Sequence, residues 1–445
     1  MPDQSTPTPT PLAAQKQVIP TRGPVGRWIE PWYVAYAILG ALASGIAAIL
    51  IPLMVNTHGG SSTEIGSAIA AQNVGALAAP LWGSLADRSK AYRGIFFIGF
   101  MIIGLGFLAF TLFQGAEAWL AGAFLIGFGT AASNTVASLF VVEFTPAAEW
   151  GLRISWLQTF NAGGSVIGMF LAGMLAPRTG MLLSALLVLP AIAIGGKGLP
   201  VPAARQRPFS HIHRDALARL VRHMEPATAS VISHIHRPRL KDLALLGTAM
   251  RSAFGVFLSG WFVFSLAISA FSTLYPVLMK NSFDMPVSRS SALIAIVTAL
   301  SIPFYNLAGR LVSRFGPGAM LAVGIGARSV ALIGLGIVAL GRPAGGGAID
   351  VILLFALFQG IWPLLSVAAN DLAAATAPFG EGSAMGFFNA AAAIASAAGA
   401  VSGGAVADYF GYPAVSLFAG LALLGSLGCV LPLTRRHFEV TRAGS

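Results

Sequence analysis

Two short charged turns carry the most recognisable chemistry in this sequence. The first, G-S-L-A-D-R-S-K, begins at Gly83 and contains Asp87 and Arg88; the second, G-R-L-V-S-R-F-G, begins at Gly309 and contains Arg314. Aligned on their Gly, Leu and Arg positions, the two turns lie 226 residues apart. An acid beside a base at a helix end can form ion pairs with charged groups on a neighbouring helix.

Two further charged residues, Glu143 and Arg153, flank the loop between the fourth and fifth long apolar segments. Asp87 is expected at a helix C-terminus, where the helix dipole disfavours an anion, so it needs a cation or a neighbouring helix N-terminus. Glu143 and Arg153 could complete such a cluster with Asp87 and Arg88. Ser313 replaces the acid in the second turn, so the acid–base pair occurs only in the first turn. The alternative is that these charges only orient the chain and solvate a loop.

One ionisable residue falls inside a long apolar segment. Arg328 lies near the middle of residues 318–340, and an ionisable group at membrane depth is costly and is by default a functional candidate. Arg328 either binds a negatively charged group or has a structural role only. The acidic residues, Asp408 among them, fall near segment ends, so no acid lies clearly inside an apolar segment.

Enzyme chemistry finds little support in the sequence. Residues 345–347 are a Gly triplet with no following Lys-Ser/Thr, so there is no phosphate-binding loop. The single cysteine, Cys429, excludes a disulfide framework and a Cys-based zinc site. Two His-x-His pairs at 211–213 and 234–236 lie among arginines that would repel a metal ion. We therefore predict no enzyme activity, no cofactor and no metal site.

The chain that must position these groups is too apolar to fold in water. Its 445 residues are 56% hydrophobic and 10% charged, with a mean hydropathy of +0.77, whereas a soluble protein is about 25% charged. A helix needs roughly 20 apolar residues to cross a bilayer. The sequence predicts twelve such helices: 33–56, 64–85, 94–113, 118–142, 152–176, 181–198, 243–279, 287–311, 318–340, 349–372, 383–407 and 412–433.

The basic residues set the predicted orientation. The net charge is +11, but the charges lie between apolar segments, which argues against nucleic-acid binding and for control of topology. One set of connections contains almost all the Lys and Arg; the opposite set contains only Arg178, Lys280, Arg289 and Arg342. This bias predicts a cytoplasmic-membrane protein with both termini in the cytoplasm.

The repeat extends beyond the two turns. Glu143 matches Asp371, and the triplet 160–162 (Phe-Asn-Ala) matches 388–390, both at an offset of 228 residues. The sequence therefore predicts two pseudo-symmetric six-helix bundles at 33–200 and 243–434. A tail at 1–32, a linker at 201–242 and a tail at 435–445 are all predicted to be cytoplasmic.

From about residue 33 to 433 the chain resembles the major facilitator superfamily. Gly83, Asp87 and Arg88 match the family's G-x-x-x-D-R-x-G-R-R/K loop, with Lys90 in place of the second Gly and Arg93 as the later basic residue. The resemblance implies a monomeric all-α secondary transporter with twelve transmembrane helices. It also implies that the loop charges, with Gly309 and Arg314 in the second copy, latch the bundles when the transporter opens outward.

The resemblance also implies which residues face a central cavity, namely those of the first, fourth, seventh and tenth helices. Their aromatic and neutral polar side chains suit an amphiphilic or uncharged solute, although each alone could serve packing instead. The candidates are Tyr36, Asn134, Ser138, Trp261, Ser265, Tyr275, Gln359 and Trp362, with Arg328 from the ninth helix as a further candidate.

Small residues mark two further helices. Gly163, Gly164, Gly168 and Gly173 lie in the fifth, and residues 390–407 of the eleventh are nearly all small. Small residues allow close helix approach in lipid. They predict either a smooth seam on which the two bundles slide or ordinary tight packing.

The sequence favours export of a hydrophobic or amphiphilic compound, as in drug-exporting members of the family. Uptake of a small polar or anionic metabolite, with Arg328 binding its charge, is one alternative. A non-transporting membrane assembly factor is another. The predicted partners are a small-molecule substrate, with or without proton coupling, and the lipid bilayer.

Overall fold

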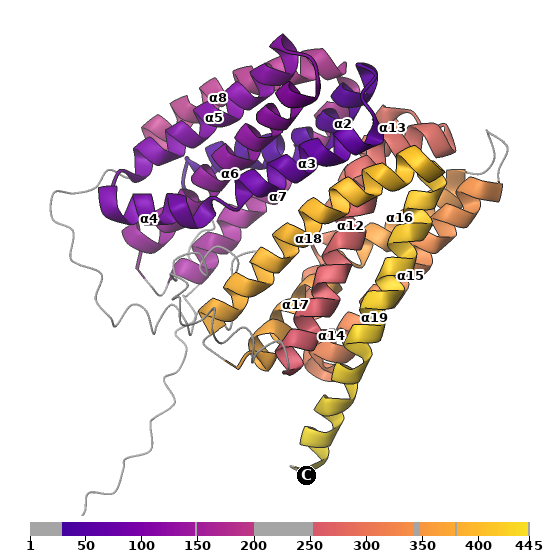
Figure 1. Ribbon diagram of the computed structural model, residues 1–445. Coiled ribbons are helices and arrows are strands. Elements are labelled where there is room, and N and C mark those ends of the chain that lie inside the picture. The colour runs from indigo at the N-terminus through magenta and orange to yellow at the C-terminus, as the bar shows by residue number, and fades with distance from the viewer. Residues whose placement is uncertain (1–28, 147–148, 200–251, 342–347, 379–380, 444–445) are drawn as a thin grey trace, which may run out of the picture.

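The computed structural model describes residues 29–146, 149–199, 252–341, 348–378 and 381–443, and in these ranges the chain forms helices and no strands (Figure 1). The first half contains α1 (Tyr33–Gly40), the π-helix η2 (Ala41–Ile46), α2 (Ala47–Thr57), α3 (Ser62–Ala76), α4 (Ala79–Ser89), α5 (Tyr92–Leu112), α6 (Ala116–Phe144), α7 (Trp150–Met174) and α8 (Pro177–Gly198). The second half contains α12 (Ala253–Phe283), α13 (Val287–Ser301), α14 (Phe304–Phe315), α15 (Pro317–Gly341), α16 (Ala348–Gly360), α17 (Trp362–Thr376), α18 (Glu381–Phe410) and α19 (Tyr412–Ala443).

Each of the twelve predicted segments is helical over most of its described residues. Within these ranges, nine stretches are long and apolar enough to cross a bilayer, and ten if the bent pair α13–α14 counts as one span. The other two segments are the interrupted pair α3–α4 and the more polar α7, which contains Arg153, Gln158 and Asn161. Their polar side chains can be tolerated in a bundle because neighbouring helices cover them.

Three of the predicted helices are interrupted rather than continuous. The breaks fall between α3 and α4, between α13 and α14, where the axis bends by 55°, and at Ile361 between α16 and α17. Pro80, Pro303 and Pro363 stand at or beside these breaks. Proline removes a backbone donor and clashes with the preceding turn, so it ends one helix and starts the next. The predicted start of the seventh helix, 243–251, lies outside the described residues, as does the linker at 201–242.

The helices of each half pack mainly with one another, and contact between the halves is concentrated at one end. We call this end, where α2 stops and α3 begins, the distal end; the opposite end, where α1 begins, is the terminal end. The most extensive packing between the halves joins α3 to α18 and α7 to α13 (Figure 1). The sections nearer the terminal end, α4 and α14, pack chiefly against helices of their own half. The halves are therefore brought together at the distal end.

The two halves also repeat the same helix crossing. The Ser269 hydroxyl on α12 donates to the backbone oxygen of Ser396 on α18, at 2.6 Å. The equivalent residues 228 positions earlier are Ala41 and Gly168, where a side chain at Gly168 would overlap the Ala41 carbonyl. The internal repeat therefore extends to packing contacts.

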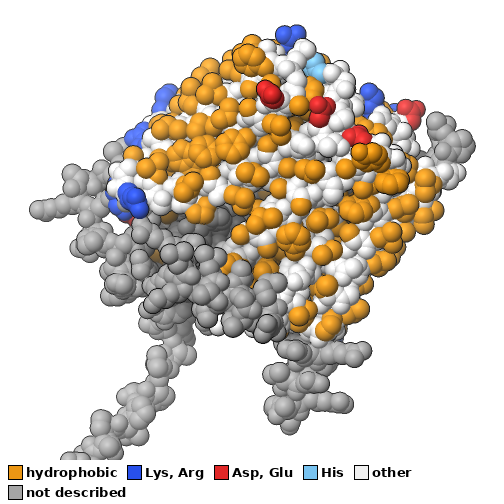
Figure 2. Space-filling model, viewed as in Figure 1, with side chains coloured by type: hydrophobic (Ala, Val, Ile, Leu, Met, Phe, Trp, Pro, Cys, Tyr) orange, Lys and Arg blue, Asp and Glu red, His pale blue; other side chains and the backbone are white. Residues whose placement is uncertain are grey.

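The outer surface is apolar along most of its height. Figure 2 shows hydrophobic side chains spread across the visible face, with most charged groups towards its ends. On α15 the residues Val323, Val330 and Ile337, each seven positions apart, are exposed by 56%, 64% and 60%. Side chains spaced by two helical turns share one face, and that face is fit for lipid rather than water. The protein is a multi-pass membrane protein.

The turn between α4 and α5 explains the irregular residue in the first charged motif. Lys90 caps α4 in the left-handed region, with φ 54° and ψ 15°, at the position where the family loop has Gly. In the second copy the equivalent Gly316 has φ 86° and ψ 147°. Lys90 tolerates the left-handed conformation while its ammonium group donates to the Tyr92 hydroxyl at 3.1 Å.

We therefore expect opposite effects from two substitutions at these equivalent positions. Lys90→Gly should raise the free energy of unfolding by up to about 1 kcal/mol because it removes left-handed strain. Gly316→Ala should lower it by about 1–3 kcal/mol because its backbone region suits only glycine. Thermal unfolding of the purified protein in detergent would measure both, and a loss of stability in Lys90→Gly would show that the contact with Tyr92 outweighs the strain.

Candidate functional site

A polar cluster lies among three helices of the first half. The Tyr36 hydroxyl on α1 donates to Oδ1 of Asn134 on α6 and accepts from Nε2 of Gln158 on α7 at 3.4 Å. Nδ2 of Asn161 donates to the Tyr36 backbone oxygen at 3.4 Å. Tyr36 is buried, whereas the three amide side chains are half-buried. The cluster therefore combines neutral donors and acceptors on one predicted cavity wall.

Tyr36 and Asn134 are among the residues predicted from the sequence to face the cavity, whereas Gln158 is not. A signal was available, because Gln158 precedes the repeat residue Asn161 by three positions and so shares its helix face. In the structure this face of α7 packs against α1, which brings the Gln158 amide to the Tyr36 hydroxyl.

An aromatic stack lies in the second half. The Trp261 ring on α12 stacks on Phe264 with centroids 4.6 Å apart and on Phe388 of α18 at 5.0 Å. Phe257 stacks on Phe388 at 5.8 Å. The four rings, contributed by two helices, form a continuous stack, and all four are buried. Phe388 belongs to the repeated Phe-Asn-Ala triplet, although its aromatic partners could not be read from the repeat.

Arg328 lies against the edge of this stack. Only 2% of the residue is exposed, and its guanidinium carbon lies 4.5 Å from the Phe358 centroid, 5.2 Å from that of Trp362 and 5.9 Å from that of Phe264. We call these three rings with Arg328 the arginine cage. Its Nε atom is buried with no hydrogen-bond partner. The ninth helix therefore contributes an inward-facing cation among rings of α12, α16 and α17.

The remaining cavity candidates take different positions. The Tyr275 hydroxyl donates to the Ser290 backbone oxygen at 2.8 Å, and Gln359 Nε2 donates to Thr298 Oγ1 at 3.3 Å. Both bonds tie α12 or α16 to α13, so here these side chains connect helices. Ser138 and Ser265 are both buried, and Ser138 Oγ lies among the unpaired buried atoms of the described chain.

The predicted latch residues are spread along the terminal end. Arg153 Nη1 lies 2.7 Å from Glu30 Oε1, and its Nε lies 2.9 Å from Glu149 Oε2. Neither acid was selected from the sequence, although the spacing of four residues between Glu149 and Arg153 is that of a helical ion pair.

The other members of that set show fewer contacts. Arg88 is exposed and Glu143 is half-buried; Gly83 is buried, and Gly309 has open space where a side chain would project. The Arg314 guanidinium lies 5.3 Å from the Phe315 ring. Since the Asp87 side chain is outside the described part of the structure, a cluster around it stays a prediction.

A cross-half contact that sequence analysis did not anticipate closes the distal end. Asp408, near the end of α18, accepts hydrogen bonds from the backbone N–H groups of Ser62 and Thr63, each at 2.8 Å. These are the first residues of α3, in the other half. The Ser62 hydroxyl also lies 3.2 Å from the Tyr412 hydroxyl. A carboxylate from one half thus caps a helix N-terminus of the other, where the dipole favours an anion.

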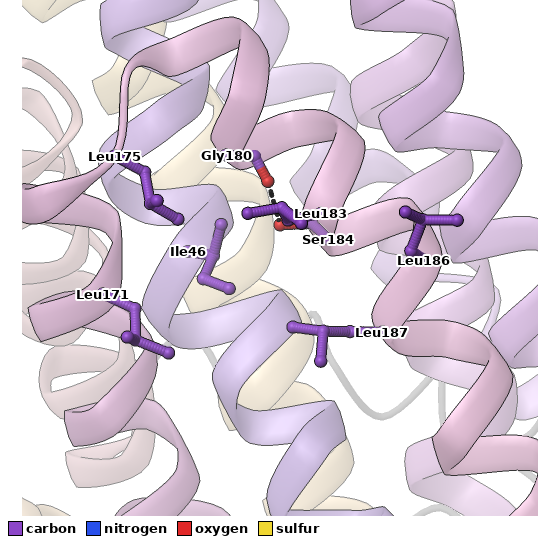
Figure 3. Close-up of a pocket in the computed structure, with 8 residues that line it drawn as sticks. All are labelled: Ile46, Leu171, Leu175, Gly180, Leu183, Ser184, Leu186 and Leu187. Atoms are coloured by element: carbon purple, nitrogen blue, oxygen red, sulfur yellow. Dashed lines mark hydrogen bonds between the residues drawn. The ribbon is translucent and has the colours of Figure 1, made fainter.

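A pocket of about 370 Å³ lies elsewhere, between η2, α7 and α8 (Figure 3). Its polar feature is the Ser184 hydroxyl, which donates to the Gly180 backbone oxygen at 2.7 Å. None of the predicted site residues line it. Its lining is otherwise apolar and partly exposed to lipid: Ile46, Leu171, Leu175, Leu183, Leu186 and Leu187.

No group of three or more His, Cys, Asp or Glu side chains that could hold a metal occurs in the described ranges. The two His-x-His pairs lie within residues 200–251, outside those ranges.

Solved structures of similar fold come from several transporters. The nucleoside transporter NupG has a TM-score of 0.70 at 13% identity, with 90% of this chain and 98% of that chain covered. The human organic anion transporter MFSD10 has a TM-score of 0.57 at 17% identity, covering 92% and 100%. A D-xylose–proton symporter has a TM-score of 0.60 at 14% identity, covering 88% and 96%.

These identities support a shared fold only. The sequence profile of the Major Facilitator Superfamily matches residues 33–380, and that match includes the first charged turn, the polar cluster and the arginine cage. With a match over most of its length and this two-part helical architecture, the chain belongs to the major facilitator superfamily.

Proposed function

We propose that this protein is a secondary transporter that exports a small amphiphilic solute by alternating access. The observation that carries this proposal is the pairing of a neutral polar cluster around Tyr36 in one half with an aromatic stack and arginine cage in the other. The aromatic rings lie on α12, α16, α17 and α18, the counterparts of α1, α6 and α7 in the repeat, whereas Arg328 lies on α15, whose counterpart α5 contributes nothing to the polar cluster. A solute with a polar and an apolar part can contact both halves and so couple their movement.

The transport cycle follows from the closure at the distal end. With both termini in the cytoplasm, the distal end is extracellular, and the packing of α3 on α18 and of α7 on α13 closes the described form on that side. The bundles at 33–200 and 243–434 then rock about the solute while the linker at 201–242 joins them. Charges at Asp87, Arg88, Glu143 and Arg153, with Gly309 and Arg314, close the terminal end in the opposite state.

Export is favoured by the aromatic lining and by a loop like that of drug-exporting relatives. The similar structures include transporters of nucleosides, organic anions and D-xylose with protons, and this range supports small-solute transport without naming the solute. Uptake of an anionic metabolite is the second candidate, favoured by the buried Arg328.

Flux into inverted and right-side-out vesicles tests both the activity and its direction. We expect a panel of fluorescent aromatic amphiphiles to accumulate in inverted vesicles containing the protein. Gln158→Ala should lower the rate roughly fivefold to tenfold, since it removes a hydrogen bond worth about 1 kcal/mol from the polar cluster. Thr159→Ala is the matched control, because Thr159 is exposed and bonds only to its own helix.

Each alternative has its own outcome. Accumulation in right-side-out vesicles alone would show that the protein takes the solute up and does not export it. Absence of flux for every solute, together with a stably co-purifying membrane protein, would replace transport by an assembly role.

A further inference from the structure

The surroundings of Arg328 narrow the substrate class. On the basis of the proposed transport function, we infer that Arg328 binds the carboxylate of the transported solute, and that the substrate is an organic anion with an aromatic or otherwise flat apolar body. The site is the arginine cage together with the adjoining stack of Trp261 and Phe388.

Burial without an acidic partner is the first argument. Arg328 is 2% exposed and lies near the middle of α15, where a charge in the bilayer core is expensive unless it is paired. In the described chain the ion pairs join Arg153 to Glu30 and Glu149. Arg328 instead contacts aromatic faces, so its positive charge is stabilised but not neutralised.

The geometry of the cage is the second argument. The rings of Phe264, Phe358 and Trp362 attract a cation through their π faces, which holds the guanidinium in place without using its N–H donors. Nε has no acceptor. A guanidinium binds a carboxylate through two parallel hydrogen bonds, and a side-on carboxylate would supply the acceptor that Nε lacks. An arginine kept only for structure would be expected to donate from Nε to a carbonyl oxygen.

The continuity of the aromatic surface is the third argument. Phe264 belongs to both groups, with its ring 5.9 Å from the Arg328 guanidinium and 4.6 Å from the Trp261 ring. A carboxylate bound at Arg328 would therefore bring its body next to the stack, whose rings are all buried in this form and must separate to admit it. Flat rings favour offset stacking with such faces, which is why the body is assigned as aromatic or flat and apolar.

Binding also has to rearrange the cage, because Nε is sealed from solvent in this form. Anion binding that draws Arg328 away from the rings would move α15 relative to α12 and α17. Solute binding would then bias the conformational equilibrium by its different affinity for the two arrangements.

Matched acid and amide pairs test the assignment directly. The probes are benzoate with benzamide, phenylacetate with phenylacetamide, and 2-naphthoate with 2-naphthamide, titrated by tryptophan fluorescence and thermal shift on the full-length protein in nanodiscs. We expect at least one carboxylate to bind wild-type protein tenfold or more tightly than its amide. Arg328→Gln should reduce that ratio to about one, whereas Arg328→Lys should keep part of it.

The control is Arg310→Gln, since Arg310 is an exposed arginine on α14, and it should leave the ratio unchanged. Equal binding of acid and amide, no binding of any carboxylate, or a preference that survives in folded Arg328→Gln would overturn the assignment. The wild-type comparison does not depend on the folding of a variant. Flux of neutral amphiphiles without carboxylate preference would overturn this inference while leaving the proposed transport in place; absence of all flux would overturn the transport proposal itself.

Discussion

Replacement of Asp408 by alanine is expected to open the distal end of the protein. Asp408 joins α18 to the first two backbone N–H groups of α3 at 2.8 Å each, so it holds the two halves together. Charge-assisted hydrogen bonds at a partly exposed site contribute about 1–2 kcal/mol. The distally closed population should fall by roughly fivefold to thirtyfold relative to the open one.

Electron–electron distances between spin labels would measure this change. On a Cys429→Ser background, labels at Gln114 and Lys280 report on the two halves, since both residues are exposed near the distal ends of α5 and α12. Asp408→Ala should add a longer distance component that is weak or absent in the parent protein.

A matched control separates closure from capping of the helix. Glu64 accepts from the Ser61 backbone N–H at 2.7 Å and completes a capping box within the same helix terminus. Glu64→Gln therefore disturbs α3 without touching the other half, and we expect its distance distribution to match the parent protein. Identical distributions in Asp408→Ala and the parent would remove Asp408 from any role in closure.

Gly164→Ala is the second substitution with a large expected effect. A methyl group at Gly164 would overlap the Ala37 carbonyl oxygen on α1, so α1 and α7 must separate to accept it. Overpacking of this kind typically costs about 1–3 kcal/mol. Because Ala37 follows Tyr36 directly, we expect lower thermal stability together with lower solute flux.

The neighbouring glycine provides the control. Gly163 has open space where its side chain would project, and Gly163→Ala should leave stability unchanged or raise it by up to about 1 kcal/mol, since alanine is the better helix former. Thermal unfolding of both variants in the same detergent is the measurement. Equal losses in both would mean that backbone flexibility, rather than helix contact, selects glycine here.

The glycines of α7 and α18 differ in which helices they contact. The middle of each face packs inside its own half, as Gly164 does on α1 and Gly399 on α12. The ends of both faces meet the other half: Gly173 would place a side chain 2.6 Å from Ser291, and Gly404 lies against Ser62. The sequence left tight packing and a seam between the halves as alternatives. In the structure the middle of each helix packs within its own half, and the end of each helix contacts the other half.

The sequence by itself determined the membrane class, the approximate helix segments and the internal repeat. The physical reason is local: in lipid each backbone N–H must bond within its own helix, so spans must be long and apolar, and their lengths can be read from the chain. The repeat is equally readable, because the turns at Gly83 and Gly309 keep their residue types at a constant offset.

Only the tertiary structure decided which side chains meet. Asp408 and Ser62 lie 346 positions apart, Arg153 pairs with Glu30 before the first helix, and Arg328 turns inward to rings from three helices. In water an apolar stripe reveals the buried face of a helix, but in a bilayer both the buried and the lipid-facing sides are apolar. Helix rotation, and therefore the partner of each polar group, is set by packing between helices that the pattern along one helix does not contain.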